Sequence, residues 1–361
     1  MSEIKITGLQ ARAVNVPMRR PLHTGSGVVE TAPLVLIDLH ASGGVTGCSY
    51  VFSYTPLALK PLTKFIENLG EAIRGQTLAP CDIEQDLRRR LRLMGAQGFA
   101  AMALAGIDMA AWDALAKVHG VPLAVLLGSA PRAVQAYNSC GLGLIGPERA
   151  AVEARELVAP GYKAVKVRLG YPDLATDIAV FRSVRTAVGD AVLLPVDYNQ
   201  CLTVSEAIAR ARRLDEEGVY WIEEPTHAED YVGHAAIARE ARTPVQLGEN
   251  WWGPSDMAKS LAAGASDFAM TDAVKIGGVS GWLRAAALAE AYRVPVSSHL
   301  YPEISAHLLT VTPTAHWLEY VDWAEPVLAE PLRIESGFAT ASGAPGTGVA
   351  WDEAAVARLL Y

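Results

Sequence analysis

Three stretches of the sequence decide the fold: VLLPVDYN (192–199), VYWIEEP (219–225) and PVQLGEN (244–250). Each is a short apolar run that ends in polar residues, and a segment with helical periodicity follows it. Five further runs resemble them: QAYNS (135–139), KAVKVR (163–168), DFAMTDAVKI (267–276), PVSSH (295–299) and HWLE (316–319). Buried strands that alternate with helices are typical of parallel βαβ units. Eight such strands in about 190 residues predict a (β/α)8 barrel, or a variant that lacks one helix.

The chain before this pattern is organised differently. Residues 1–55 alternate apolar and polar side chains in short runs such as LVLIDLHAS, which predicts antiparallel hairpin strands. In residues 55–127 the apolar side chains recur with the period of an α-helix, which predicts helices there. Strands followed by helices predict a separate α+β domain. We therefore expect this domain at residues 1–130, the barrel at 131–321, and a tail at 322–361 that packs back on the first domain.

The composition excludes several classes of protein. Of 361 residues, 51% are hydrophobic and 19% are charged, which excludes disorder and leaves ample material for a large core. The formal net charge of −8 is a poor match for nucleic acid or an anionic membrane surface, so we expect neither as a partner. The small share of charged residues suggests that some surface is buried between subunits.

Other features bear on the compartment. The start, MSEIKITGLQ, lacks the basic and apolar regions of a signal peptide. The most apolar stretch, residues 98–107, is shorter than the about 20 residues that a membrane span needs, so we expect a buried helix there. The cysteines are widely spaced and form no CxxC pair, which predicts a cytoplasmic protein with reduced thiols at Cys48, Cys81, Cys140 and Cys201.

Ionisable residues end nearly every expected strand of the barrel, where the catalytic groups of such barrels lie. Among them, Asp197, Glu223 and Glu249 follow one another at spacings of 26 residues, so they would lie side by side on the barrel rim. Three adjacent carboxylates repel one another unless a cation neutralises them. Ligands that offer only oxygen favour a hard ion, and Mg²⁺ is the usual choice.

Two further strand ends complete a chemical hypothesis. An aspartate beside a histidine fixes its tautomer and raises its basicity, so Asp272 and His299 could act together as a general base. Glu319 could donate a proton or a hydrogen bond if an apolar site raises its pKa. These groups suit the removal of a proton next to a carboxylate, with the metal, Lys166 and Glu319 stabilising the charge that develops on its oxygens.

Several longer motifs then resemble the enolase superfamily, and within it the mandelate racemase subgroup. They are APLVLIDL (32–39), AGIDMAAWDALAKVHG (105–120), VDYNQ (196–200), WIEEPT (221–226), PVQLGENWWGP (244–254), KIGGVSGW (275–282), SSHL (297–300) and EISAHLLTVTPTAHWLE (303–319). The resemblance covers nearly the whole chain. It implies an N-terminal capping domain, a modified (β/α)7β TIM barrel, an essential Mg²⁺, and a homo-oligomer such as the octamer common in the family.

The resemblance also implies residue roles. The metal ligands would be Asp197, Glu223 and Glu249, and the proton-handling dyad would be Asp272 and His299. Lys166 would neutralise the substrate carboxylate and Glu319 would hydrogen-bond one of its oxygens. Asn199 and Ser139 resemble further substrate contacts. The segment from Leu22 to Val29, together with Tyr54, would close over the site.

One departure from the family pattern bears on the reaction. The racemases carry Lys-x-Lys and use the second lysine as a base, whereas this chain has Lys166, Val167 and Arg168. Holding an arginine with a pKa of roughly 12.5 neutral at pH 7 costs about 7 kcal/mol. The pKa of a lysine begins about two units lower, and its surroundings lower it further with ease. Arg168 is then either an inefficient base or an electrostatic clamp, which means a fixed positive charge that holds the substrate. As a clamp, it would leave His299 as the sole base for β-elimination of water from an acid sugar.

The capping segment PLHTGSGVVETAPL (21–34) favours the other alternative, because its small apolar side chains suit an aromatic ring. We therefore expect first a racemase or epimerase of a 2-hydroxy acid, working through an enediolate, and second an acid-sugar dehydratase. A non-enzymatic scaffold is a third possibility, which the loss of several metal ligands would favour, and none is lost.

Taken alone, the GxGxxG match at 141–146 would suggest an NADP-binding reductase, but it is a weak signal and leaves the carboxylates at the strand ends unexplained.

Overall fold

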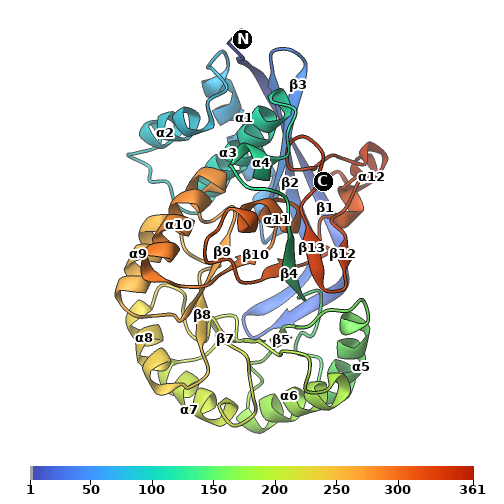
Figure 1. The fold of residues 1–361 in the computed structure, drawn as a ribbon, viewed down its shortest axis with the longest axis vertical. Helices are drawn as coiled ribbons and strands as arrows, with labels where there is room; N and C mark the ends of the chain where they lie inside the picture. Colours follow the sequence, from blue (N-terminus) through green and yellow to red (C-terminus); the bar gives the residue numbers. More distant parts are fainter. Residues whose placement is uncertain (1–2) are drawn as a thin grey trace.

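Eight parallel strands form the central barrel of the computed structural model, which describes residues 3–361 (Figure 1). They are β4 (Ala133–Asn138), β5 (Val167–Arg168), β6 (Val196–Asp197), β7 (Ile222–Glu223), β8 (Val245–Leu247), β9 (Phe268–Asp272), β10 (Val296–His299) and β11 (Leu318–Tyr320). Strands β5 to β10 pair in chain order, and β11 pairs with β4. Single bridges from Asn138 to Val165 and from Val296 to Ala315 close the ring. All eight expected strands are therefore confirmed.

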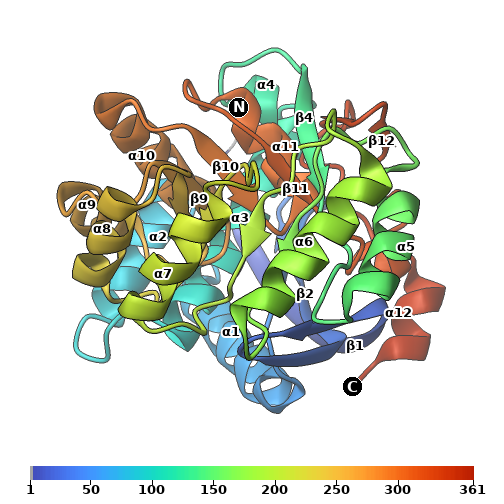
Figure 2. The same cartoon turned by 90° about the horizontal axis from the view of Figure 1, so that it is seen from below.

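Seven helices connect these strands and surround them (Figure 2). They are α5 (Pro147–Val158), α6 (Leu174–Val188), α7 (Val204–Leu214), α8 (Tyr231–Glu240), α9 (Pro254–Ala262), α10 (Gly278–Tyr292) and α11 (Pro302–Thr310). Side chains that accept hydrogen bonds from backbone N–H groups cap three of them, with Asp173 at α6, Thr203 at α7 and Asp230 at α8. Strand β11 leads instead into the short helix η2 (Glu325–Val327). Eight strands with seven helices confirm the (β/α)7β architecture.

The first part of the chain forms an antiparallel sheet covered by helices. Strands β1 (Ile6–Thr24), β2 (Gly27–Ala41) and β3 (Val45–Phe52) pair in sequence order, as expected from their alternating pattern. The short helix η1 (Pro56–Ala58) follows, and then α1 (Leu59–Ile73), α2 (Pro80–Arg90), α3 (Phe99–Val118) and α4 (Leu123–Leu126). This α+β unit adjoins the barrel along α3 and α10 (Figure 1).

Helix α3 is the apolar centre of this unit. By length and composition it could cross a membrane, but 83% of its most apolar window is buried inside the protein, as expected for this stretch. It lies very close to β3, where Gly47 makes room: a Cβ atom there would lie 2.0 Å from the carbonyl oxygen of Ala110. The helix therefore serves as the core onto which the N-terminal sheet packs.

The C-terminal segment contacts both parts of the molecule. Strands β12 (Ile334–Glu335) and β13 (Phe338–Thr340) form a hairpin, and β13 extends the barrel sheet beside β4. Helix α12 (Glu353–Leu359) returns to the first sheet, where Glu353 forms an ion pair with Arg12 at 2.5 Å. The indole of Trp351 donates a hydrogen bond to Asp38.

One buried carboxylate joins three of these segments. Asp113 of α3 accepts hydrogen bonds from the backbone N–H of Cys48 at 2.8 Å and from the N–H and hydroxyl of Thr347 at 2.6 and 2.8 Å. It also lies 2.6 Å from the ammonium group of Lys117. We expect Asp113→Ala to lower the free energy of unfolding in urea by about 2–4 kcal/mol, because it leaves three hydrogen-bond donors unpaired and removes the counter-charge of the half-buried Lys117. The matched change at the exposed Asp190 should alter it by less than about 0.5 kcal/mol.

Candidate active site

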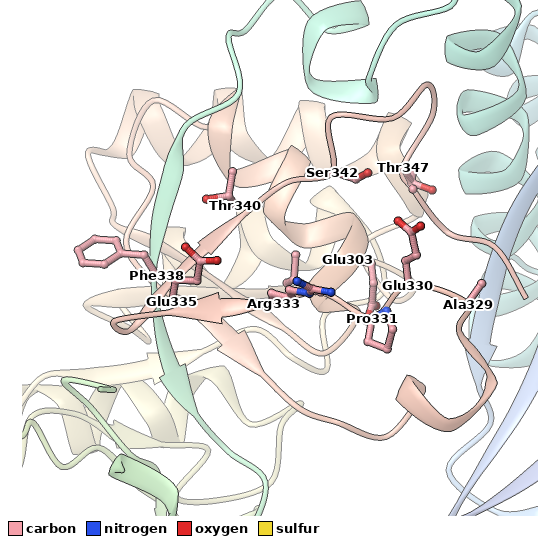
Figure 3. A pocket seen from close by; sticks show the side chains of 12 residues that line it. Glu303, Ala329, Glu330, Pro331, Arg333, Glu335, Phe338, Thr340, Ser342 and Thr347 are labelled. Atoms are coloured by element: carbon pink, nitrogen blue, oxygen red, sulfur yellow. The ribbon is translucent and has the colours of Figure 1, made fainter. Parts of the chain in front are cut away.

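A cavity of about 330 Å³ lies between the carboxyl ends of the barrel strands and the first domain. Its lining includes nine of the residues expected from the sequence: Leu22, Val29, Tyr54, Lys166, Arg168, Asp197, Asn199, Glu249 and His299. A larger hollow of about 600 Å³ lies beside α11 and the C-terminal segment (Figure 3). Among the described residues, its lining includes Glu303, Arg333 and Thr347 but none of the expected site residues. The chemistry therefore points to the smaller cavity.

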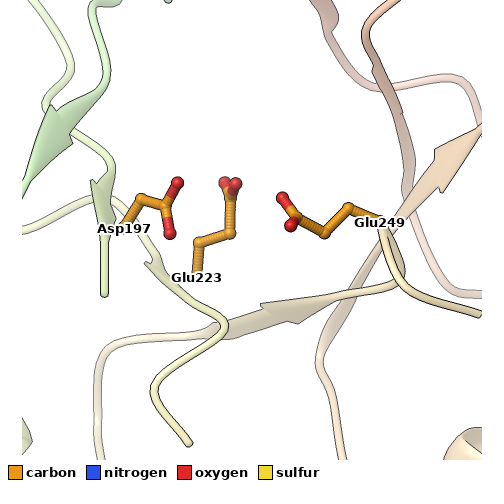
Figure 4. Close-up of side chains that lie close together, drawn as sticks. All are labelled: Asp197, Glu223 and Glu249. Carbon is orange, nitrogen blue, oxygen red and sulfur yellow. The ribbon is translucent and has the colours of Figure 1, made fainter. Parts of the chain in front are cut away.

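Three carboxylates converge at one side of this cavity (Figure 4). Asp197 ends β6 and pairs in register with Glu223 at the end of β7, and Glu249 follows β8. One oxygen from each side chain lies within 4.8 Å of the other two, and all three residues are buried. The spacing of 26 residues thus places the three carboxylates side by side, as expected.

The electrostatics of this cluster call for a cation. Burial raises the pKa of Glu223 to about 8, and the neighbouring carboxylates add to this rise while Lys166 opposes it. The next residue, Glu224, also has a pKa raised to about 8, first by burial and then by Glu249. Its Oε2 atom finds no hydrogen-bond partner within residues 3–361. Crowded, buried oxygen donors of this kind fit a hard divalent cation.

Lys166 is the counter-charge that the chain itself supplies. Its Nζ atom lies 2.6 Å from Glu223, 2.8 Å from Glu319 and 3.3 Å from Asp197. Burial alone would lower the pKa of Lys166, but these carboxylates outweigh it and raise the pKa well above its usual value. Lys166 is therefore a fixed cation between the triad and Glu319.

Asp272 and His299 form the expected pair. The imidazole Nδ1 lies 2.7 Å from Asp272 Oδ2, while Asp272 Oδ1 accepts hydrogen bonds from the N–H groups of Val274 and Lys275. These bonds fix the carboxylate, which fixes the ring, so that Nε2 points to Glu249 at 3.3 Å. Burial opposes protonation of the ring, but the surrounding carboxylates outweigh it and raise the pKa of His299 to about 9.

Glu319 differs from its expected state. Although burial favours the neutral acid, Lys166 and then His299 lower the pKa of Glu319 to about 2. The condition for a proton-donor role of Glu319, a raised pKa, is therefore not met in this arrangement. The carboxylate accepts a hydrogen bond from the N–H of Leu300 at 2.9 Å, which holds it beside the cavity as an anion.

Arg168 is anchored on the loop that follows β4. Its guanidinium donates hydrogen bonds to the carbonyl oxygens of Gly141 at 2.6 Å and Ser139 at 3.4 Å, and to the hydroxyl of Ser139 at 2.9 Å. Ser139, expected to contact substrate, is fully buried and holds Arg168 instead. Asn199, the other expected contact, donates a hydrogen bond to Asp197, and its Oδ1 lacks a partner in the described chain.

The capping segment closes the cavity from the first domain. Leu22 and Val29 face each other across the hairpin formed by β1 and β2, as the register shows. Near its tip, the hydroxyl of Ser26 donates a hydrogen bond to the carbonyl oxygen of Asn199. The hairpin also packs against the glycine-rich loop at 141–146: a Cβ on Gly143 would lie 2.7 Å from the carbonyl oxygen of His23. The absence of a side chain at Gly143 thus lets the backbone of this loop pack closely against the backbone of the hairpin.

Sequence reasoning missed four polar residues of the site. Gln200, Asn250 and Lys275 line the cavity, and Lys275 Nζ donates to Asn250 Oδ1 at 2.7 Å, whereas the buried Glu224 lies beside the triad and outside the lining. The sequence offered a signal for Glu224 in the paired glutamates of WIEEPT, whereas the lysine of KIGGVSGW follows its strand end by three residues. Strained backbone marks the site as well, because positive φ angles occur at non-glycine residues around it: Tyr54, Asn199, Gln200, Glu224, Leu300 and Tyr301.

Family models match both halves of the chain. The model of the mandelate racemase / muconate lactonizing enzyme N-terminal domain matches residues 6–128, and the enolase C-terminal domain-like model matches residues 149–355. These ranges correspond to the N-terminal α+β unit and to most of the barrel.

Individual relatives span the length of the chain. A Bradyrhizobium enolase, crystallised with magnesium and mandelic acid, is 46% identical over 100% of this chain and 99% of its own, with a TM-score of 0.96. The L-talarate/galactarate dehydratase of Salmonella typhimurium is 35% identical over 89% of this chain and 81% of its own. A Streptomyces coelicolor racemase with bound magnesium is 29% identical over 99% of this chain and 100% of its own, with a TM-score of 0.94. The names of the second and third relatives indicate different reactions, a dehydration and a racemisation, and crystal structures of all three proteins contain magnesium.

Proposed function

The chain belongs to the mandelate racemase / muconate lactonizing enzyme family of the enolase superfamily, and on that premise we propose a specific reaction for it. His299 removes the α-proton of a 2-hydroxy carboxylate as the single base, and a hydroxyl group leaves from the β-carbon as water. The protein is thus an Mg²⁺-dependent enzyme, and the finer proposal is an acid dehydratase.

Mg²⁺ is the cofactor, and the buried triad of Asp197, Glu223 and Glu249 fits it by donor type and by charge. Bound there, the ion supplies positive charge that stabilises the carboxylate oxygens of the substrate as the enediolate forms. Lys166 adds a fixed positive charge beside the triad. Glu319 lies 2.8 Å from Lys166 and 3.9 Å from His299. As an anion it only accepts hydrogen bonds, so it donates one to the substrate carboxylate only after it has taken up a proton.

The anchoring of Arg168 is the observation that carries the choice of reaction. Its guanidinium donates to two carbonyl oxygens and one hydroxyl, which hold it as a hydrogen-bond donor on the loop after β4. A protonated arginine cannot accept a proton from the second face of a substrate. His299, whose Nδ1 is fixed by Asp272, is therefore the base of this site.

Elimination then follows from the remaining groups. The electron pair of the broken C–H bond forms a carbon–carbon double bond, and the C–O bond at the β-carbon breaks with its electrons. His299 has gained the α-proton and returns it to the departing hydroxyl, so that water leaves. The resulting enol becomes a 2-keto acid by tautomerisation, and no further reactant is needed.

Racemisation or epimerisation, which the sequence placed first, is the second candidate function. An apolar part of the lining, formed by Leu22, Val29 and Phe52, could hold an aromatic ring. The Bradyrhizobium relative with mandelic acid supports the same class of ligand for a related cavity. In this alternative Arg168 would serve as the second base.

A panel of substrates separates the two candidates. The protein with Mg²⁺ is incubated with aryl 2-hydroxy acids and with aldonic and aldaric acids, and both 2-keto acid and optical rotation are followed. We expect keto acid from at least one sugar acid and no change of rotation without keto acid. A loss of rotation that leaves only hydroxy acid would overturn the dehydratase proposal in favour of the isomerase.

A conservative change at Arg168 gives a directional prediction. A lysine has one nitrogen and cannot reproduce the hydrogen bonds that the two guanidinium nitrogens donate to Ser139 and Gly141. We therefore expect Arg168→Lys to lower kcat/KM by about 10–100-fold. The opposite result is expected if the residue is a base, because lysine loses its proton far more easily. Arg155→Lys on α5 is the matched control and should leave the rate unchanged. Initial rates of keto acid formation and of racemisation measure the effect.

A further inference from the structure

We propose that Lys275 forms a second anion subsite in the cavity, which binds the distal carboxylate of a 2-hydroxy dicarboxylate. The proposal rests on the proposed function, because it takes the metal side of the cavity as the place of the first carboxylate. It identifies the substrate class that the site prefers and assigns a role to a residue outside the catalytic groups.

The position of Lys275 allows such a contact. It follows β9 by three residues, is nearly buried, and contributes to the lining of the cavity together with Asn250 and Tyr54. In the order of the barrel sheet, the strands of the triad lie between β5, which carries Arg168, and β9. Lys275 is therefore separated from Arg168 by the metal side of the site.

The charge of Lys275 lacks a counter-charge in the protein. Its Nζ atom donates to the amide oxygen of Asn250 at 2.7 Å and lies 4.3 Å from the ring centre of Tyr54 and 5.9 Å from that of Trp252. These partners stabilise a cation but are neutral. Within residues 3–361, no carboxylate oxygen lies within 4.0 Å of this ammonium. Because an ammonium has three N–H donors, at least one remains available to a ligand.

Two other buried cations of the described chain are compensated by carboxylates. Arg210 pairs with Asp177 at 2.5 Å, and Lys166 contacts three carboxylates. A buried charge without an opposite charge is costly, and a ligand anion removes that cost when it binds. In the described part of the chain, Arg168 is also buried without a carboxylate partner, but its guanidinium donates to three protein acceptors, whereas Lys275 Nζ donates only to Asn250. The uncompensated charge and spare N–H donors of Lys275, on the cavity wall, therefore point to an anionic group of the substrate.

A carboxylate fits this place better than a neutral hydroxyl. The amide of Asn250 is already committed, since its oxygen accepts from Lys275 and its nitrogen donates to Glu249 at 3.2 Å. The subsite thus offers charge and N–H donors, which a carboxylate oxygen accepts with a strong, charge-assisted hydrogen bond. A cavity of about 330 Å³ has room for a short dicarboxylate.

Binding measurements test the subsite without relying on turnover. Calorimetry on the Mg²⁺-loaded protein compares 2-hydroxybutyrate with malate, 2-hydroxyglutarate and 2-hydroxyadipate. We expect at least one diacid to bind about 10–100-fold more tightly than the monoacid, as one charge-assisted contact provides. Lys275→Met should abolish this preference and leave monoacid affinity within about 2-fold. Lys275→Arg should keep most of it, and Lys259→Met, an exposed lysine on α9, should change nothing.

Each other result has a defined meaning. Equal weakening of monoacid and diacid by Lys275→Met, or weaker binding of Mg²⁺ in the same variant, would overturn the subsite and assign Lys275 to positioning Glu249 through Asn250. Absence of any diacid preference in the wild-type protein would also overturn it. Diacid binding that depends on Lys275, together with no keto acid from any aldonic or aldaric acid that carries a β-hydroxyl group, would refute only the proposed function, whereas absence of all binding would refute both.

Discussion

Replacement of His299 by asparagine is expected to stop exchange of the substrate α-proton with solvent and to lower kcat by about 10²–10⁴-fold. Asparagine preserves a hydrogen-bond donor toward Asp272, which lies 2.7 Å from His299, but cannot accept a proton. The loss should therefore fall on kcat more than on KM. Proton NMR in D₂O measures exchange, and keto acid formation measures turnover.

His119→Asn is a suitable control, because His119 is exposed at the end of α3 and should leave both rates unchanged. The variants are compared at saturating Mg²⁺, since His299 lies 3.3 Å from Glu249 of the triad. Full α-proton exchange in His299→Asn would place the base elsewhere in the cavity.

Glu249→Gln is expected to weaken Mg²⁺ binding by about 100-fold or more and to abolish turnover at ordinary Mg²⁺ concentrations. The amide keeps the size of the side chain but removes one of three negative charges whose oxygens lie within 4.8 Å of one another. Calorimetric titration with Mg²⁺ alone measures the affinity without substrate. Activity is then measured over a range of Mg²⁺ concentrations.

The matched control is Glu240→Gln, an exposed residue at the end of α8 that pairs with Arg212. This variant should bind Mg²⁺ as the wild-type protein does. An unchanged Mg²⁺ affinity in Glu249→Gln would remove Glu249 from the metal site, and an unchanged rate would remove the triad from the mechanism.

The barrel and its catalytic strand ends could be predicted because they follow a local pattern. Each parallel strand is an apolar run, and the residue at its carboxyl end faces the site, so spacing alone brought together Asp197, Glu223 and Glu249. The same rule paired Asp272 with His299 on neighbouring strands, as their contact confirms.

The remaining features of the site depend on tertiary contacts that leave little local trace. Arg168 is held by the carbonyl oxygens of Ser139 and Gly141, and backbone carbonyls carry no residue-specific signal. The ionised state of Glu319 depends on its distance of 2.8 Å from Lys166, a residue far away in the chain. Lys275 lies beyond its strand end and reaches the cavity only through the turn that Asp272 caps.

Chiral analysis of substrate recovered from D₂O tests the single-base mechanism most directly. One optically pure enantiomer of a substrate is incubated with the Mg²⁺-loaded wild-type protein and recovered before completion. We expect keto acid as the product, with the recovered substrate retaining its configuration whether or not deuterium has entered at the α-carbon. Formation of the opposite enantiomer with an α-deuterium from solvent would show a second base opposite His299 and would contradict the assignment of Arg168 as a clamp.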